Sequence, residues 1–372
     1  MKKIVLTVTN DLVTDNRLHK VGSSLREMGA DVLLVGRILP GSKSLNRNYA
    51  THRLRLYFRK GPLFYFEYNF RLFWFLLFHR FDIYVANDLD TLPANFLAAK
   101  IKRKPLVYDS HEYFTQVPEL IHRPRIQRIW HRLEKMLLPR VTAAYTVCQS
   151  IAEVYFKEYG VPFHIVRNLP VKRSKATKVD NAKKLRLNDE KLVLYQGVLN
   201  LGRGLDLAIR AMNFLNHVRL IIIGDGDVRE QLEELVEREG LKEKVSFLGR
   251  IPVEELYDYT HQADLGISLE EDLGMNYRFA LPNKLFDYIQ AEIPVICSDL
   301  PEMKNIVESY KVGRIVTNRT PEMLADLIQN ALEESGKRML WKTNCKLAAC
   351  ALNWEQEEKI LEEIYRPFMD GK

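Results

Sequence analysis

Short apolar runs alternate with amphipathic segments along the first 170 residues. Apolar positions in residues 18–28 and 92–102 recur with a helical period, which predicts two helices. Strands that alternate with helices predict a parallel sheet with helices on both faces. The apolar runs that have the length of buried strands are residues 4–8, 32–35, 81–88, 105–112, 145–148 and 164–166.

The same pattern restarts after a polar, lysine-rich connection at residues 171–184. Helices are expected at residues 206–212 and 229–239. The spacing of apolar residues in 354–368 predicts a last helix that either caps the second domain or crosses back to the first. Strands are expected at residues 191–197, 218–226, 245–249, 264–269, 294–298 and 313–316.

These patterns indicate the α/β class, with two successive doubly wound domains. We expect the first at residues 1–170, the second at 171–352 and the C-terminal helix at 353–372. A chain of 372 residues is also longer than one hydrophobic core usually serves. Ligands bind outside the carboxyl ends of the strands in such sheets, so the site is expected in a cleft between the two domains.

Composition narrows the class of protein. Hydrophobic residues make up 47% of the chain and charged residues 28%, which excludes disorder and coiled coil. The 4 cysteines form neither a CxxC pair nor a metal-like cluster, so we expect no disulfide framework, no metal site and a cytoplasmic location. The longest apolar stretch, residues 72–78, is far shorter than the roughly 20 residues of a spanning helix.

Charge is distributed unevenly. Residues 1–170 hold 26 Lys and Arg against 14 Asp and Glu, whereas the rest of the chain holds 29 against 34. The basic half therefore predicts an anionic partner, for which nucleic acid and anionic lipid both qualify. No recognisable nucleic-acid module is present, so nucleic acid is not expected as a partner.

An aromatic and basic segment at residues 60–80 favours anionic lipid as this partner. Nine aromatic residues fall between Phe64 and Phe78, among arginines, and further basic stretches lie at residues 53–60 and 121–135. One interpretation is a helix that lies in the plane of an anionic membrane and receives a lipid-linked acceptor. The alternative is a helix whose aromatic side chains belong to a buried core.

Two glycine-containing loops follow predicted strands. In YQGVLNLGRGLDLAI, Gly197, Gly202 and Gly204 allow close backbone approach, and Arg203 and the following helix start suit an anion. The alternative is a flexible turn with a solvated arginine. In IIIGDGDV, the third glycine of a dinucleotide fingerprint is missing and the loop is acidic, which disfavours a nicotinamide cofactor.

The segment LPNKLFDYIQ predicts a helix that begins at Pro282. Lys284 falls in its first turn, where a lysine opposes the helix dipole unless an anion is bound. We therefore expect a phosphate there. The alternative is a surface lysine on an amphipathic helix.

These motifs, together with VSFLG, ADLGISL and PNKLFDYIQAEIPVICSDLPE in the same order and spacing, resemble the retaining glycosyltransferases of family 4, which have the GT-B fold of two Rossmann-like domains. The resemblance extends over nearly the full length. It implies a nucleotide-sugar donor, UDP- or GDP-linked, with no separate cofactor and no divalent metal. It also implies that the donor's own phosphate oxygen accepts the acceptor proton.

The resemblance also assigns donor-binding residues in the second domain. Arg203 and Lys284 match the basic pair that holds the diphosphate, and Asp287 matches the second acid of a Glu-x7-Glu motif that binds the ribose. The first acid falls on Phe279, a departure that leaves Glu271, Asn276 or backbone groups to hold the sugar. The other implied donor contacts are Gly197, Gly202, Gly204, Gly226, Arg250, Ile251, Leu281, Pro282 and Asn283.

In the first domain, His111 matches a histidine close to the donor sugar, and it joins Arg203 and Lys284 as a catalytic candidate. The candidates for acceptor binding are Asp15, Asn16, Arg17, Asp109 and Glu112. The DLD sequence at Asp88 and Asp90 is interpreted as the turn before a helix.

The expected function is transfer of a sugar to a glycan or lipid-linked acceptor in cell-surface polysaccharide synthesis, in the cytoplasm or on the inner face of the membrane. Two alternatives stay open. The first is a catalytically silent relative that binds nucleotide-sugar or glycan in an assembly complex, because of Phe279. The second is a GT-B epimerase that hydrolyses its nucleotide-sugar.

Overall fold

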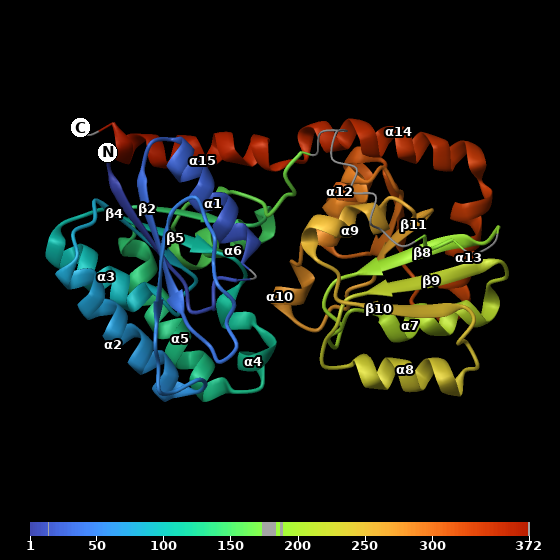
Figure 1. Cartoon of the computed structure of the whole chain (residues 1–372), viewed down its shortest axis with the longest axis horizontal. Helices are drawn as coiled ribbons and strands as arrows, with labels where there is room; N and C mark the ends of the chain where they lie inside the picture. Colours follow the sequence, from blue (N-terminus) through green and yellow to red (C-terminus); the bar gives the residue numbers. More distant parts are fainter. Residues whose placement is uncertain (14, 173–183, 187–188, 371–372) are drawn as a thin grey trace. The chain divides into compact units, whose positions relative to one another are not determined.

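The computed structural model describes residues 1–13, 15–172, 184–186 and 189–370. The chain divides into two compact units, of which the first combines Met1–Asn168 with Glu355–Lys372 and the second is Leu169–Trp354 (Figure 1). Most of the expected connection at residues 171–184 lies outside the described residues. No helix among the described residues has the length and apolar character needed to span a membrane.

In the described part of the first unit, seven parallel strands form one sheet in the order β3-β2-β1-β4-β5-β6-β7. The strands are β1 (Lys3–Thr7), β2 (Asp31–Arg37), β3 (Ala50–Leu54), β4 (Ile83–Asn87), β5 (Leu106–Ser110), β6 (Ala143–Thr146) and β7 (His164–Ile165). The α-helices are α1 (Asn16–Glu27), α2 (Pro62–Phe78), α3 (Leu92–Lys102), α4 (Pro118–Ile121), α5 (Pro124–Leu137), α6 (Gln149–Tyr159) and α15 (Trp354–Met369). Short 3₁₀ turns lie at Phe114–Gln116 and Leu138–Arg140.

The apolar pattern predicts the central strands of this sheet correctly. It misses β3, whose sequence ATHRL is largely polar. Among the strands that the structure describes, β3 lies at the edge of the sheet and pairs with β2 alone. An edge strand has one neighbour and need not be apolar on both faces. Helix α1 starts at Asn16, two residues earlier than expected, because the Asp15 side chain accepts a hydrogen bond from the Leu18 amide and caps it.

The C-terminal helix α15 packs on the first unit. The buried Glu357 carboxylate pairs with Arg167 at 2.7 Å, and the Tyr365 hydroxyl lies 3.3 Å from that of Tyr145 on β6. Helices α2 and α3 lie side by side on one face of the sheet (Figure 1).

In the described part of the second unit, six parallel strands form a sheet in the order β10-β9-β8-β11-β12-β13. The strands are β8 (Lys191–Gln196), β9 (Val218–Ile223), β10 (Val245–Gly249), β11 (Leu265–Ser268), β12 (Val295–Ser298) and β13 (Gly313–Val316). The α-helices are α7 (Leu205–Ala211), α8 (Arg229–Arg238), α9 (Val253–Thr260), α10 (Met275–Arg278), α11 (Asn283–Gln290), α12 (Pro301–Tyr310), α13 (Pro321–Glu333) and α14 (Ser335–Ala351). A 3₁₀ turn lies at Met212–Phe214.

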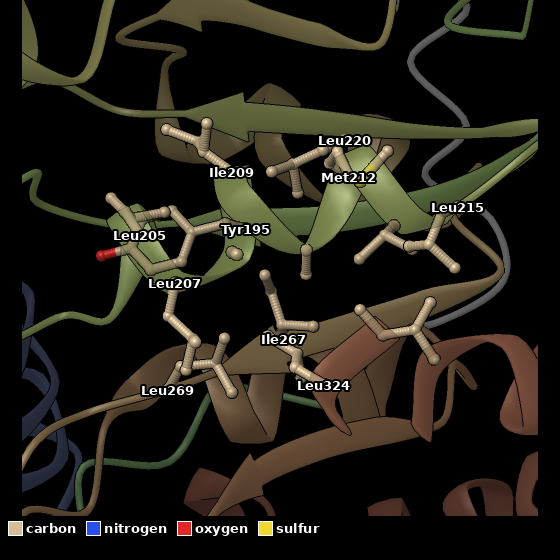
Figure 2. Close-up of a cluster of buried hydrophobic side chains, with 14 of the residues drawn as sticks. Tyr195, Leu205, Leu207, Ile209, Met212, Leu215, Leu220, Ile267, Leu269 and Leu324 are labelled. Carbon is tan, nitrogen blue, oxygen red and sulfur yellow. The ribbon is translucent and has the colours of Figure 1, made fainter. Parts of the chain in front are cut away.

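Both faces of the second sheet are buried, as the continuous apolar strands predict. Successive residues of β8 point to opposite faces: Val193 and Tyr195 join one hydrophobic cluster, and Leu192 and Leu194 join the other. Figure 2 shows the first cluster, in which side chains of α7 gather with those of the strands. Each fully buried aliphatic side chain contributes about 1.5–3 kcal/mol to folding, so these clusters hold the strand ends and the loops that follow them in place.

Candidate functional sites at the strand ends

A buried carboxylate forms the centre of the first unit's polar cluster. Asp109, at the end of β5, is fully buried. The Arg17 guanidinium donates to it from Nη2 at 2.7 Å and from Nε at 3.3 Å, while Nη1 donates to the Val166 carbonyl at 2.8 Å. Burial alone would raise the pKa of Asp109, but Arg17 and then His111 hold it down at about 2.

His111 lies between two carboxylates. Its Nε2 is 3.1 Å from Asp109 Oδ2, its Nδ1 is 3.4 Å from Asp88 Oδ2, and its backbone N–H donates to Asp88 Oδ1 at 2.8 Å. Burial disfavours the charged ring, but Asp88 and Asp109 outweigh burial and raise its pKa to about 9. At neutral pH the ring is therefore an imidazolium, which carries a proton on each nitrogen, donates from Nε2 to Asp109 and faces Asp88 with Nδ1.

Asp88 and Asp90 do form the turn before α3, as the sequence predicts, and they also belong to this cluster. Asp90 is buried, accepts a hydrogen bond from Thr9 Oγ1 at 2.6 Å, and its Oδ1 has no hydrogen-bond partner among the described residues. Burial, and then repulsion from Asp88, raise the pKa of Asp90 to about 7. The sequence offers no signal that distinguishes these residues from an ordinary helix-start turn.

The five acceptor candidates differ in what they do. Arg17 and Asp109 are buried against each other, so in this structure they position His111. Asp15 caps α1, Asn16 is exposed at its start, and the Glu112 backbone carbonyl accepts from Ser110 Oγ at 2.8 Å. Contact of these residues with an acceptor stays a prediction.

The second unit also has a buried carboxylate at its centre. Glu270 follows β11 and is fully buried. Lys284 Nζ lies 2.7 Å from Glu270 Oε1, and Arg203 Nη1 lies 3.5 Å from the same oxygen. Ser268 Oγ donates to Oε2 at 2.7 Å. Burial works against ionisation, but Lys284, Ser268 and Arg203 keep the pKa of Glu270 below its ordinary value. Two cations therefore share one carboxylate, and the cluster retains one positive charge.

The position of Lys284 rules out a surface lysine. Helix α11 begins after Pro282 as predicted, and the lysine in its first turn is 7% exposed. Its Nζ lies 4.1 Å from the centroid of the Tyr195 ring. A Cβ on Gly197 would stand 3.9 Å from that nitrogen. The glycine loop and the first turn of α11 therefore meet at Lys284.

Arg203 is half-buried and approaches the same carboxylate from the glycine loop. Its guanidinium also lies 5.8 Å from the centroid of the Tyr277 ring. Because of these contacts, the alternative interpretation of Arg203 as a freely solvated side chain is wrong. The sequence-based candidates Arg203, Lys284 and Gly197 are thus brought together in one place.

The glycines of the loops after β8 and β9 allow the backbones of these two loops to pack closely together. The Leu199 N–H donates to the Asp225 carbonyl at 3.1 Å, and a Cβ on Gly224 would stand 1.8 Å from the Gly197 carbonyl oxygen. A Cβ on Gly226 would stand 2.4 Å from the Leu199 carbonyl oxygen. Larger residues would force these loops apart, so Gly226 has a packing role whether or not it touches a donor.

The remaining donor candidates lie at nearby strand ends and on α11. Asp287 Oδ2 accepts from Gln196 Nε2 at 2.9 Å. Arg250 is 80% exposed, and its Nε lies 3.5 Å from Asp225 Oδ2. Ile251 and Leu281 are partly buried against the second hydrophobic cluster, Pro282 precedes α11, and Asn283 is exposed. The proximity of any of these groups to a nucleotide stays a prediction.

Sequence reasoning missed Glu270. It offered the neighbouring Glu271, whose carboxylate instead lies 4.0 Å from Arg319 and is 35% exposed. A signal existed: Glu270 is the first charged residue after an apolar strand, which is where ligand-site residues of a parallel sheet occur. In the described chain, no group of three or more His, Cys, Asp or Glu residues could hold a metal ion.

Two Rossmann-like units in one chain are the architecture of the GT-B fold, which solved glycosyltransferase structures share with this chain. Residues 15–169 match the model of Glycosyltransferase Family 4, and residues 177–347 match that of Glycosyl transferases group 1. The chain belongs to this glycosyltransferase family.

Curated relatives agree with this class. An uncharacterized glycosyltransferase of Methanocaldococcus jannaschii is 26% identical over 49% of this chain and 46% of its own length. The alpha-D-kanosaminyltransferase of Streptomyces kanamyceticus is 23% identical over 73% of this chain and 72% of its own. An α-1,4-N-acetyl-D-galactosaminyltransferase of Campylobacter jejuni, whose name gives a PP-undecaprenol-linked saccharide, is 29% identical over 48% and 46%. The matches to the first and third of these span about half of each relative.

Solved structures share the fold. A sucrose-phosphate synthase from Thermosynechococcus elongatus superposes with a TM-score of 0.80 at 18% identity, covering 100% of both chains. The Anabaena protein HepE in complex with UDP-glucose has a TM-score of 0.75 at 18% identity, covering 98% of this chain and 99% of its own. At this identity the likeness establishes the architecture alone.

Proposed function

We propose that this glycosyltransferase is retaining and independent of metal ions, and that it moves a sugar from a UDP- or GDP-sugar to a glycan or lipid-linked acceptor. One observation carries the proposal: Lys284 and Arg203 meet at Glu270 and leave one positive charge beside the glycine loop. A diphosphate gains negative charge as it leaves a sugar, and fixed cations stabilise that charge without a metal.

The relatives support the substrate classes. HepE is similar in fold and was solved with UDP-glucose, which supports a nucleotide-sugar donor. The Campylobacter relative is named for a PP-undecaprenol-linked saccharide, which supports a lipid-linked acceptor and a role in cell-surface polysaccharide synthesis. We place such a reaction in the cytoplasm, at the inner face of the membrane.

The proposed roles follow from the two clusters. Lys284 and Arg203 hold the diphosphate, Asp287 the ribose, and the residues around Arg250 the base. The acceptor proton passes to a phosphate oxygen of the donor on the same face of the sugar, which retains the anomeric configuration. His111 carries a proton on both nitrogens at neutral pH, so we assign it positive charge and hydrogen-bond donation near the sugar rather than the role of a base.

Donor consumption by the purified protein tests this proposal. We expect turnover of a UDP- or GDP-sugar only when a membrane extract supplies acceptor, and unchanged turnover after EDTA treatment. The Arg203→Gln variant should lose about 100-fold or more of the rate. The matched control is Arg210→Gln, whose arginine forms a surface ion pair with Glu239 at 2.6 Å and should leave turnover unchanged.

The other outcomes identify the rival functions. Turnover without extract would indicate an epimerase that hydrolyses its donor. Nucleotide binding without any turnover would indicate the silent relative that Phe279 suggests. A thermal-shift screen against UDP, GDP, ADP and their sugars identifies the base, because a ligand that binds only the folded state raises its stability.

A further inference from the structure

Helix α2 is apolar on two faces. Its inner face, with Phe64, Tyr68, Leu72 and Leu76, is buried in the core of the first unit. Its outer face carries a second apolar line, which we call the aromatic row: Leu63, Phe66, Phe70, Trp74 and Phe78, all exposed. A helix on the surface of a globular protein normally presents polar residues there.

The aromatic row is continuous. Ring centroids lie 6.1 Å apart for Phe66 and Phe70, 6.3 Å for Phe70 and Trp74, and 5.6 Å for Trp74 and Phe78. Exposed apolar side chains scattered singly are ordinary, but a contiguous patch of this length marks an interaction surface.

One hollow rich in arginine adjoins the row, and a second shares Arg55 with the first. A cavity of about 580 Å³ between β3 and α2 is lined by Arg53, Arg55 and Arg71 together with Phe70 and Trp74 of the row. A second, of about 310 Å³, is lined by Arg37, Arg55 and Arg59 with apolar neighbours. Each hollow therefore combines positive charge with apolar walls, the two features of a site for an anionic amphiphile.

The charge of this surface is only partly compensated, since Arg53 pairs with Asp11 at 3.3 Å and few other acids of the described chain lie near its cations. Residues 53–80 contain 6 Lys and Arg and a single acid, Glu67. The Glu67 carboxylate already accepts from the N–H groups of Tyr57 and Phe58 at 2.9 Å each and pairs with Arg71 at 2.8 Å. It thus fixes the loop before α2 to the helix, and it neutralises Arg71 alone.

We propose that the aromatic row and its two hollows dock the protein on an anionic phospholipid membrane, with the rings among the headgroups and the arginines on lipid phosphates. Charge complementarity favours an anionic membrane over a second copy of the chain as the partner of this surface. Pairing two copies through the row would bring two sets of arginines together, whereas a phosphate surface neutralises them.

Docking would also position the first unit's polar cluster. On the inner face of α2, the Tyr68 hydroxyl donates to the Val8 carbonyl at 2.5 Å and Asn69 Nδ2 donates to the Asp90 carbonyl at 2.8 Å. The membrane-bound helix therefore holds the loops around Asp90 at a fixed distance from the bilayer. A lipid-linked acceptor could reach these loops from the bilayer. This consequence rests on the proposed function, but the docking proposal does not depend on that function.

Vesicle flotation of the full chain tests the proposal. We expect the protein to float with vesicles of phosphatidylcholine and phosphatidylglycerol, to sink with phosphatidylcholine alone, and to be released by high salt. Removing two arginines in Arg55→Gln/Arg59→Gln should weaken binding about tenfold or more, at about 1 kcal/mol for each basic residue near the surface. Phe70→Ser/Trp74→Ser should weaken it about tenfold or more through lost apolar burial.

The second unit supplies matched controls on α14. Leu347→Ser removes an equally exposed apolar side chain, and Lys346→Gln removes an exposed cation; both should bind vesicles as the wild type does. A direct readout is tryptophan fluorescence. Trp130, Trp341 and Trp354 are buried and Trp74 is 41% exposed, so a blue shift on vesicle binding should disappear in Trp74→Phe.

Three results would overturn docking: flotation that ignores lipid charge, flotation that survives both double substitutions, or dimerisation in solution that Phe70→Ser/Trp74→Ser abolishes. The last would assign the row to a second copy of the chain. Nucleotide-induced thermal shifts on the same proteins test the proposed function separately. Loss of that response with intact flotation would refute the donor assignment and leave docking in place.

Discussion

Both units bury a carboxylate at the end of a central strand and surround it with cations, but they balance charge differently. In the first unit, Asp109 and Asp88 face Arg17 and His111, so two anions meet two cations as long as the neighbouring Asp90 keeps its proton. In the second, Glu270 alone faces Lys284 and Arg203. The same arrangement thus gives the first unit a neutral cluster, which is suited to hydrogen bonds with hydroxyl groups. It gives the second unit a positive cluster, which is suited to phosphate.

The largest expected effect comes from removing the lysine of the positive cluster. Lys284→Met should lower turnover about 100-fold or more, because it removes a cation from the leaving group. It should also cost about 3 kcal/mol of the free energy of unfolding, because Glu270 would stay buried without its nearest cation. Urea unfolding and donor turnover measure the two effects.

A second substitution separates these effects. Lys284→Met/Glu270→Gln removes the stranded carboxylate together with the lysine, so most of the lost stability should return while turnover stays low. A single variant as stable as the wild type would show that Lys284 does not neutralise Glu270. Recovery of turnover in the double variant would show that the charge of Lys284 is not what the reaction needs.

The sequence predicts the fold better than it predicts these clusters. Apolar runs define the central strands because parallel strands are buried on both faces, whereas the edge strand β3 is polar and escapes the pattern. Lys284 could be found because a lysine in a first turn is unfavourable unless something compensates for it. Its compensation includes Glu270, fourteen positions earlier, and no local rule connects the two residues.

The sequence also fails to predict which residues meet in the first unit's cluster. His111 is found through its motif, but Asp88 lies on a different strand end, and only the sheet order β1-β4-β5 makes them neighbours. The spacing of DLD fits an ordinary turn equally well. Contacts between neighbouring strand ends depend on tertiary structure and are not visible in a periodic pattern.

Asp90 should give the neutral cluster a pH dependence of stability. Its pKa in the folded protein is about 7 against an ordinary 3.8, so the folded state keeps a proton that the unfolded chain releases. Stability should therefore fall as pH rises from about 4 to about 7, and the full penalty should be present above pH 7. Asp90→Asn should remove this dependence and be at least about 2 kcal/mol more stable than the wild type at pH 8, since a shift of about three pKa units corresponds to about 4 kcal/mol.

Urea unfolding at several pH values measures this difference. The two proteins should approach equal stability below about pH 3, since Asp90 is then largely protonated in both the folded and the unfolded wild type. Equal slopes for wild type and variant between pH 4 and pH 7 would contradict the assignment and attribute the dependence to the neighbouring Asp88 or Glu112, which also act on this group.

The smallest expected effect tests how the neutral cluster keeps His111 charged. A raised pKa of about 9 contributes stability that is fully present below the ordinary 6.5 and is lost as pH rises through 9. Asp88→Asn removes one of the two carboxylates but keeps an oxygen for the His111 N–H. We expect the pKa of His111 to fall by about one unit, which corresponds to about 1.4 kcal/mol.

Histidine titration by NMR, with the His111 signal assigned from His111→Gln, measures that pKa. The control is Asp82→Asn, which breaks a half-exposed pair with Lys104 at 2.9 Å and should leave His111 unchanged. If Asp88→Asn titrates like the wild type, Asp109 alone holds the proton and Asp88 merely fixes the backbone. If it titrates lower, both carboxylates share the imidazolium, and the two clusters differ because the first has a second anion that the second lacks.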